Sequence, residues 1–274
     1  SPEELEMVAY HEAGHAVVGL KVPGGNKVQK ITIIPRGNAG GYNLMLPEKE
    51  KFNLLVDLGT NAECVIFSQN KLISTSAAAG PCFEGANICC GTPAMVGAIC
   101  EFIYKDNIKT IKNAPAVGIC ATGLIDIIAE LLKHNIIDET GRMISEKYHI
   151  TNEIYISQVD IRNFQTAKSA VYSAIKVLMK KAYCTFRDID KICIAGGFSE
   201  KLNFSNAIIT GLLPGECSSK YKAINNSSLA GTIKYALNKN DLNELIKNAR
   251  YVDLASEKDF SELFIENMNF TFFE

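Results

Sequence analysis

Three strand patterns in succession constrain the fold of this chain more than any other feature of its sequence. Apolar and β-branched residues fill about 53–58, 63–67 and 71–76, and a Gly-Thr-Asn turn stands between the first two runs. Short runs of this composition, joined by a tight glycine-containing turn, are typical of neighbouring strands in one sheet. We therefore expect a sheet to begin near residue 53.

Strands and helices alternate over the rest of the chain. The longest helical pattern covers about 160–182, where Phe164, Val171 and Leu178 recur on one face. Ile192–Ala195 has the composition of a short buried strand. Further helices are expected at about 93–104, 123–134, 203–210, 227–237 and 241–248. This alternation indicates an α/β layer architecture.

The first 50 residues differ in character from the rest. Ser1-Pro2-Glu3-Glu4 is typical of a helix start, and the helix should run to about Leu20. Val28–Pro35 predicts a strand, and a second short strand is expected near Tyr42. A charged seam at 48–51 then separates a segment of residues 1–50, too short for a dependable core, from a domain of residues 51–274.

Composition excludes several classes of partner. The 28 basic and 30 acidic residues are interspersed and give a net charge of −2, so no field would attract nucleic acid or an anionic membrane surface. No run of about 20 apolar residues predicts a membrane span, and no signal-peptide pattern is seen. Nine cysteines without a regular framework indicate reduced thiols. We expect a cytoplasmic protein.

A candidate phosphate-binding hairpin follows the first strand. Asp57 stands at the end of a buried run, and Gly59, Thr60 and Asn61 form the turn. Glycine lets backbone amides approach an anion closely, while the Thr hydroxyl and Asn amide add donors. Asp57 is placed to hold a Mg²⁺-bound water. The turn alone also fits a plain β-hairpin.

Two later segments strengthen the nucleotide interpretation. Pro115–Asp126 is a strand that breaks at small residues into a helix, so it would present a helix N-terminus to a cleft. Ile192–Ser199 repeats that arrangement, and its paired Gly196 and Gly197 would let a flat adenine or ribose lie against backbone. Together and in this order, the three segments indicate a nucleotide site more specifically than any one of them does alone.

These segments resemble the C-terminal part of the ATP-dependent reductive activators of corrinoid proteins. The residues that carry the resemblance are Asp57–Asn61, Ala79–Ala86, Gly118–Asp126, Gln158–Lys168, Ala195–Ser199 and Gly211–Pro214. The resemblance extends over about 51–270. It implies a ribonuclease-H-like lobe of the actin, sugar-kinase and chaperone ATPase superfamily, in which ATP with Mg²⁺ lies between two lobes.

The same resemblance assigns roles to individual residues. Asp57, Gly59, Thr60 and Asn61 correspond to the second phosphate-binding loop of the superfamily, and Gly196, Gly197 and Phe198 to the adenosine loop. The family's other lobe and its iron–sulfur domain have no counterpart in this sequence. We therefore expect weak nucleotide binding and poor hydrolysis unless the cleft is completed, since catalysis positions phosphates and metal from both sides.

A metal-binding motif lies in the first 50 residues. His11-Glu12-Ala-Gly-His15 places two imidazoles one helical turn apart, suited to Zn²⁺, with Glu12 as a general base in a peptidase. With Lys30–Gly37 and Gly41-Tyr42, the segment resembles the start of the FtsH-type zinc peptidase domain. Catalytic zinc needs a third protein ligand, an aspartate in that family, in a segment this chain does not contain. His134 and His149 match nothing in the peptidase family.

The leading hypothesis is a nucleotide-binding lobe of corrinoid-activator type that carries a peptidase-derived N-terminal segment, as in a fusion or chimera. It implies ATP/Mg²⁺ as ligand and a corrinoid protein as partner. One alternative is a zinc metallopeptidase, which needs a third ligand from elsewhere. The other is a non-catalytic interaction module whose exposed cleft face is covered by a second copy, so we expect a homodimer.

Overall fold

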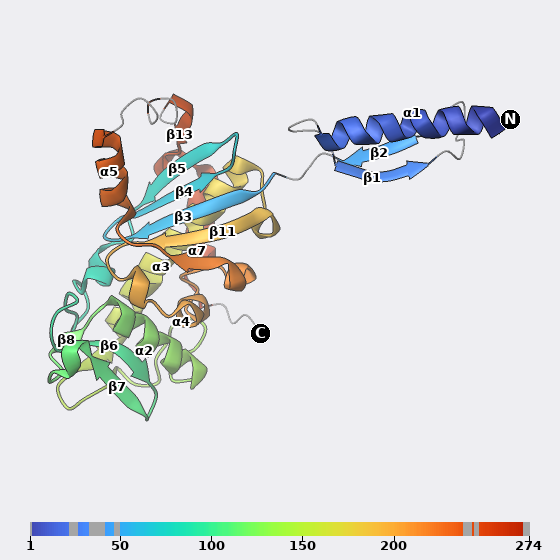
Figure 1. Ribbon diagram of the computed structural model, residues 1–274. Coiled ribbons are helices and arrows are strands. Elements are labelled where there is room, and N and C mark those ends of the chain that lie inside the picture. Colours follow the sequence, from blue (N-terminus) through green and yellow to red (C-terminus); the bar gives the residue numbers. More distant parts are fainter. Residues whose placement is uncertain are drawn as a thin grey trace. The chain divides into compact units, whose positions relative to one another are not determined.

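The computed structural model describes residues 2–21, 27–32, 42–46, 50–237, 243 and 247–270. The chain forms two compact units, residues 1–50 and 51–274, which are described separately (Figure 1). No helix within the described ranges is long and apolar enough to cross a membrane.

The first unit is one helix and a strand pair. Helix α1 (Pro2–Lys21) begins with Glu3 and Glu4 in its first turn, where acidic side chains favour the helix dipole. Strands β1 (Lys27–Thr32) and β2 (Tyr42–Leu46) pair antiparallel. The helix and the strand near Tyr42 are confirmed, and the strand expected over 28–35 is confirmed as far as Thr32, since residues 33–35 lie outside the described ranges.

A six-stranded sheet forms the base of the second unit, in the order β12-β11-β3-β4-β5-β13 (Figure 1). Strands β3 (Phe52–Leu58), β4 (Ala62–Phe67) and β5 (Leu72–Ala77) are the expected antiparallel series. The other strands pair parallel to their neighbours: β11 (Ile189–Ala195) to β3, β12 (Tyr221–Ala223) to β11 and β13 (Ala249–Tyr251) to β5. The α/β fold of the lobe is therefore confirmed.

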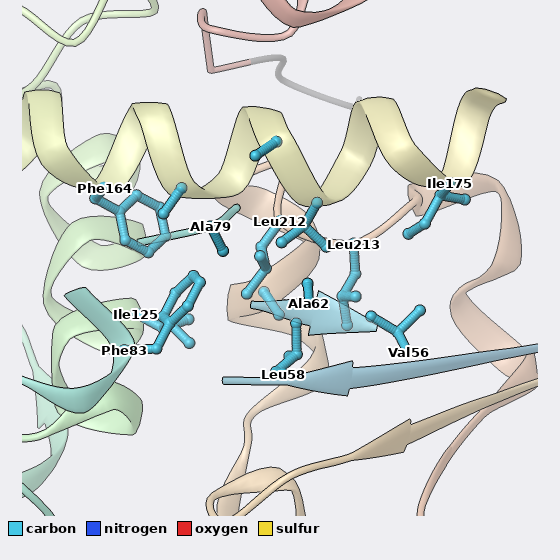
Figure 2. Packing of buried hydrophobic residues seen from close by; sticks show 14 of the residues in the cluster. Val56, Leu58, Ala62, Ala79, Phe83, Ile125, Phe164, Ile175, Leu212 and Leu213 are labelled. Carbon is cyan, nitrogen blue, oxygen red and sulfur yellow. The ribbon is translucent and has the colours of Figure 1, made fainter. Parts of the chain in front are cut away.

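Helix α3 (Gln158–Ala182) packs on this sheet and carries much of the core. Ser157 and Asp160 form a capping box at its start, and Tyr183 ends it in the left-handed conformation. Figure 2 shows Phe164 and Ile175 of the helix above Val56 and Leu58 of β3. All four side chains are almost fully buried, which fixes the helix on the sheet.

The end of the chain is held on α3 by polar side chains inside the core. Helix α7 (Lys258–Glu266) packs against α3. Ser169 donates a hydrogen bond to the carbonyl of Phe264, Gln165 to that of Met268 at 2.8 Å, and Lys168 to that of Asn269. Backbone carbonyls in the last turn of α7 and just after it thus gain partners that they would otherwise lack.

A second, smaller sheet has the order β7-β6-β8, built from β6 (Ala98–Ile103), β7 (Asn107–Thr110) and β8 (Gly118–Ile119). Helix α2 (Ala121–Lys133) packs against β6. Figure 1 shows this sheet beyond one end of the large sheet, joined to it by α3 and the loops.

The helix expected over 93–104 is wrong, because that segment contains β6. The register of β6 against β7 shifts between Ile99 and Glu101, so Cys100 is an extra residue in a β-bulge. The bulge makes Ile99 and Phe102, three residues apart, both buried. Spacing by three is the helical period, and the bulge reproduced it within a strand.

The remaining elements are short. Further elements among the described residues are helices α4 (Phe204–Ile209) and α5 (Ser227–Leu237) and strands β9 (Lys147–His149) and β10 (Tyr155–Ser157). Short 3₁₀ segments occur at Pro81–Glu84, Ile111–Asn113, Phe186–Asp188, Ser199–Lys201, Gly215–Lys220 and Leu254–Ser256. The helix expected at 241–248 falls mostly outside the described residues.

Candidate functional site

A cavity of about 1000 Å³ opens where β3 and β11 end. These two strands are parallel and in register from Leu54 beside Ile192 to Asp57 beside Ala195, so their carboxyl ends lie at one edge of the sheet. Such edges are the usual ligand sites of α/β sheets. The walls come from both sheets and from the loops and helix starts beside them. The lining residues are Asp57, Leu58, Gly59, Glu63, Phe83, Glu84, Pro93, Ala94, Cys100, Glu101, Lys109, Thr110, Ile111, Lys112, Asn113, Cys120, Ala121, Thr122, Gly196, Gly197, Phe198, Lys201, Asn226 and Ser228.

The β3–β4 turn contributes part of the hairpin predicted to grip phosphate. Asp57 and Gly59 line the cavity, whereas Thr60 and Asn61 are exposed in the same turn and lie outside its wall. The turn is fixed by the Gly59 amide, which donates to the Asn61 carbonyl at 3.1 Å, and by the Gly80 amide, which donates to the Thr60 carbonyl at 2.9 Å.

Two carboxylates face the cavity side by side. Asp57 on β3 is directly opposite Glu63 on β4, and both line the wall. Opposed residues on one sheet face have Cβ atoms about 5 Å apart, where like charges repel. The Ser227 hydroxyl donates to Asp57 Oδ2 at 3.3 Å, and the Ser76 hydroxyl to Glu63 Oε1 at 3.3 Å. This pair concentrates negative charge where a cation would relieve it.

The glycine pair after β11 forms an adjoining wall. Gly196 has φ +101, and a Cβ there would lie 2.4 Å from the carbonyl oxygen of Leu58. Only glycine lets the two chain segments approach so closely. Gly197 faces open space, and the ring of Phe198 lies 5.9 Å from that of Phe83. The backbone of Gly196 and Gly197, against which a flat adenine or ribose is expected to lie, thus borders the cavity.

Three lysines line the cavity and were not singled out from the sequence. They are Lys109, Lys112 and Lys201. Lys109 donates to Glu101 Oε1 at 2.6 Å, and that hydrogen bond raises the pKa of the Lys109 ammonium. Exposed lysines are common on any surface, so nothing in the sequence marked these. The bulge at Cys100 and the left-handed backbone of Lys112 (φ 59) shape the wall from which two of them come.

The strand-to-helix segment at 115–126 also reaches the cavity. Cys120, Ala121 and Thr122, at the start of α2, line it. A Cβ on Gly123 would lie 2.1 Å from the Ile99 carbonyl oxygen, so this glycine lets α2 approach β6 closely. Asp126 is buried instead of facing the cavity: it accepts a 2.6 Å hydrogen bond from Asn206, and burial raises its pKa.

The structure describes only part of the motif on α1. His11 is exposed, and the side chains of Glu12 and His15 are not among those described. Within the described part of the chain, no three His, Cys, Asp or Glu side chains are grouped as they would be around a metal ion.

Comparison with known proteins places the larger unit in a family. Residues 51–272 match the family described as the C-terminal domain of RACo, the ASKHA domain. The chain therefore belongs to this family, and its lobe is of the ribonuclease-H-like type expected from the sequence. Residues 1–67 match peptidase family M41, so the two matches overlap only around β3 and β4.

Individual relatives give the same division. The corrinoid activation enzyme RamQ of Eubacterium limosum is 29% identical over 83% of this chain and 44% of its own length. A solved structure titled reductive activator for corrinoid, iron–sulfur protein is 30% identical, with a TM-score of 0.72, over 80% of this chain and 40% of that one.

The N-terminal segment has its own relatives. The ATP-dependent zinc metalloprotease FtsH of Mycoplasmopsis synoviae (strain 53) is 69% identical over 86 residues, 28% of this chain and 13% of that protein. The chain thus spans less than half the length of each of these relatives. Its resemblance to a fusion of two unrelated families is confirmed.

Proposed function

We propose that residues 51–274 form a lobe that binds a nucleoside triphosphate, ATP, together with Mg²⁺ in the cavity. The observation that carries this proposal is the juxtaposition of the Asp57–Glu63 carboxylate pair with the glycine loop at Gly196-Gly197. A nucleotide needs a magnesium ion near its phosphates and an open surface for its flat nucleoside. The carboxylate pair would hold the ion, and the exposed glycine backbone would provide the surface.

The residues present fit a magnesium ion. Mg²⁺ prefers oxygen ligands and retains several waters, so it is usually bound through one or two carboxylates and the substrate phosphates. Asp57 would hold a Mg²⁺-bound water, and Glu63 would share the charge. When bound, the ion would neutralise phosphate charge. Asp57 itself is oriented by the Ser227 hydroxyl.

The other walls suit the rest of a nucleotide. The Gly59 turn would face the phosphates, with the exposed Thr60 and Asn61 just outside the cavity wall, and Lys109, Lys112 and Lys201 would offset the phosphate charge from the other sides of the cavity. Gly196, Gly197 and Phe198 would take the adenosine. A volume near 1000 Å³ is ample for a ligand of this size.

The proposed activity is limited to binding with slow hydrolysis. RamQ and the reductive activator extend well beyond the part that matches this chain. Positioning of phosphates by further groups is what accelerates phosphoryl transfer in proteins of this kind. Because both relatives are named for corrinoid activation, we propose a corrinoid protein as the partner.

For residues 1–50 we propose a peptidase-derived segment without proteolytic activity. His11 and His15 would bind zinc adventitiously, and Glu12 would have no completed site to serve.

Homodimerisation also stays a prediction. The described side chains of α5 include the exposed Leu229, Ile233 and Leu237 at four-residue intervals, which a second copy would cover. Light scattering would give the mass of the protein in solution.

The test of nucleotide binding is equilibrium dialysis of the purified chain against MgATP. Asp57→Ala should abolish saturable binding. Asp190→Ala, which removes an exposed carboxylate at the opposite end of β11, should leave it unchanged. Equal binding by both variants would refute the proposed site.

A further inference from the structure

Two cysteines of different elements line the wall of the cavity. Cys100 is the bulged residue of β6 and is half-buried, and Cys120 is the residue before α2 and is 4% exposed. Both line the cavity, and neither has a role in the proposed nucleotide site.

The backbone holds these residues side by side. Ile99 on β6 pairs with Ile119 on β8 in a parallel register, so Cys100 and Cys120 each come one residue after a paired position. The Cys120 amide donates to the Ile99 carbonyl at 3.1 Å, and the Cys120 thiol to the same oxygen at 3.2 Å. Neighbouring strands are about 5 Å apart. A disulfide spans Cα atoms about 4.4–6.8 Å apart.

We propose that Cys100 and Cys120 form a reversible disulfide in the cavity wall when the protein meets hydrogen peroxide. No other pair of thiols within the described residues combines adjacent backbone with a shared opening to the cavity. Cys89 and Cys90 are neighbours in sequence, but neither lines it.

The reaction balances in two steps. The more accessible thiol, Cys100, attacks peroxide and becomes a sulfenic acid, releasing water. The Cys120 thiol then attacks that sulfur, forming the S–S bond and releasing a second water. Two thiols are oxidised and one peroxide is reduced, and an added dithiol reverses the change.

The electrostatic setting controls the rate of the first step. Burial raises the pKa of Cys100, and the nearby Cys120 adds to this effect. Because the thiolate is the nucleophile, oxidation should be slow near neutral pH and accelerate as the pH rises. Lys109, hydrogen-bonded to Glu101 beside Cys100, acts in the opposite direction.

The disulfide would alter the cavity. The Cys120 sulfur would leave its contacts with the Ile99 carbonyl and with Thr122 Oγ1, 3.6 Å away, and the start of α2 would be tied to β6. The oxidised protein should bind MgATP at least about fivefold more weakly, because Thr122 and the neighbouring wall shift. This expectation rests on the proposed function.

The experiment uses the full chain carrying Cys89→Ser and Cys90→Ser, which removes the two other thiols of the same tryptic peptide that are not deeply buried. After peroxide treatment and digestion without reductant, mass spectrometry should find residues 72–105 linked to 113–133. Dithiothreitol should release the link. Cys100→Ser should abolish it, whereas Cys82→Ser, in the same peptide, should not.

Two results would overturn the proposal. One is the absence of the link under conditions that oxidise Cys89 or Cys90 in the parent protein. The other is a link that survives Cys100→Ser. If the link forms and MgATP affinity is unchanged, the effect on the cavity is refuted. If the reduced protein binds no MgATP, the nucleotide proposal fails while the disulfide stands on the mass measurement.

Discussion

The hydroxyl of Ser227 lies 3.3 Å from the carboxylate of Asp57, although the two residues are 170 positions apart in the sequence. Ser227 is the first residue of α5, and Asp57 is near the end of β3. The contact orients the carboxylate proposed to serve the metal and brings the start of α5 to the cavity mouth.

Removal of this hydroxyl should weaken binding without abolishing it. Ser227→Ala leaves the Asp57 carboxylate in place but lets it rotate, and a hydrogen bond of this kind contributes about 0.5–1.5 kcal/mol. We expect MgATP affinity to fall about threefold, measured by fluorescence titration. Ser218→Ala, at an exposed position away from the cavity, is the control. A loss as large as that of Asp57→Ala would mean that Ser227 contacts the ligand itself.

The glycine pair offers a matched test of backbone approach. Gly196→Ala should destabilise the fold by about 2 kcal/mol, because the new Cβ would meet the Leu58 carbonyl and φ is +101. Gly197→Ala faces open space, so its stability should change by less than about 0.5 kcal/mol. Urea unfolding measures both. Equal stability of the two variants would contradict the described turn.

Buried Lys168 should make stability depend on pH. Its ammonium lies in the core beside the Asn269 carbonyl and the Phe270 ring, and desolvation lowers its pKa from 10.5 to about 7. The folded pKa lies below the unfolded one, so the unfolded chain binds more protons between these values. Stability should therefore rise with pH above 7, by up to roughly 1.4 kcal/mol per pH unit.

Lys168→Met isolates that contribution. The variant loses the hydrogen bond to Asn269 but no longer carries a titrating group, so its stability should follow a flatter pH profile than the parent's. The measurement is urea unfolding of both proteins between about pH 6.5 and 9. Parallel profiles would show that Lys168 keeps its proton throughout that range.

The N-terminal motif should not support proteolysis. After zinc loading and buffer exchange, we expect less than one equivalent of bound metal and no cleavage of casein. The reason is that the motif supplies two histidine ligands, whereas catalytic zinc needs three protein ligands. Elemental analysis and a gel assay measure these. Stoichiometric zinc that His15→Ala removes, together with casein cleavage, would instead establish a peptidase.

The sequence predicted the three antiparallel strands of the large sheet because alternation there is regular. Strands β3, β4 and β5 bury every second residue, and a tight turn joins the first two. It failed at β6, where the bulge at Cys100 changed the spacing of Ile99 and Phe102 to a helical one. Local spacing cannot reveal a bulge, since the extra residue is defined only by its partner strand.

The lining of the cavity was predictable only where backbone demands restrict the residue. Gly196 and Gly59 stand in recognisable turns, and Asp57 ends a buried strand. Lys109, Lys112 and Ser227 come from elements distant in sequence from Asp57, and the fold alone brings the two lysines to the cavity and Ser227 to Asp57. Their residue types are ordinary on a surface, so no local pattern marks them.

The most direct test of a magnesium–nucleotide site is calorimetric titration of the chain with ATP, once with Mg²⁺ and once with EDTA. The carboxylate pair predicts one saturable site that Mg²⁺ tightens at least about tenfold, and Glu63→Gln should remove most of that gain. Binding that is absent, or equally strong in EDTA, would contradict the assignment of the cavity.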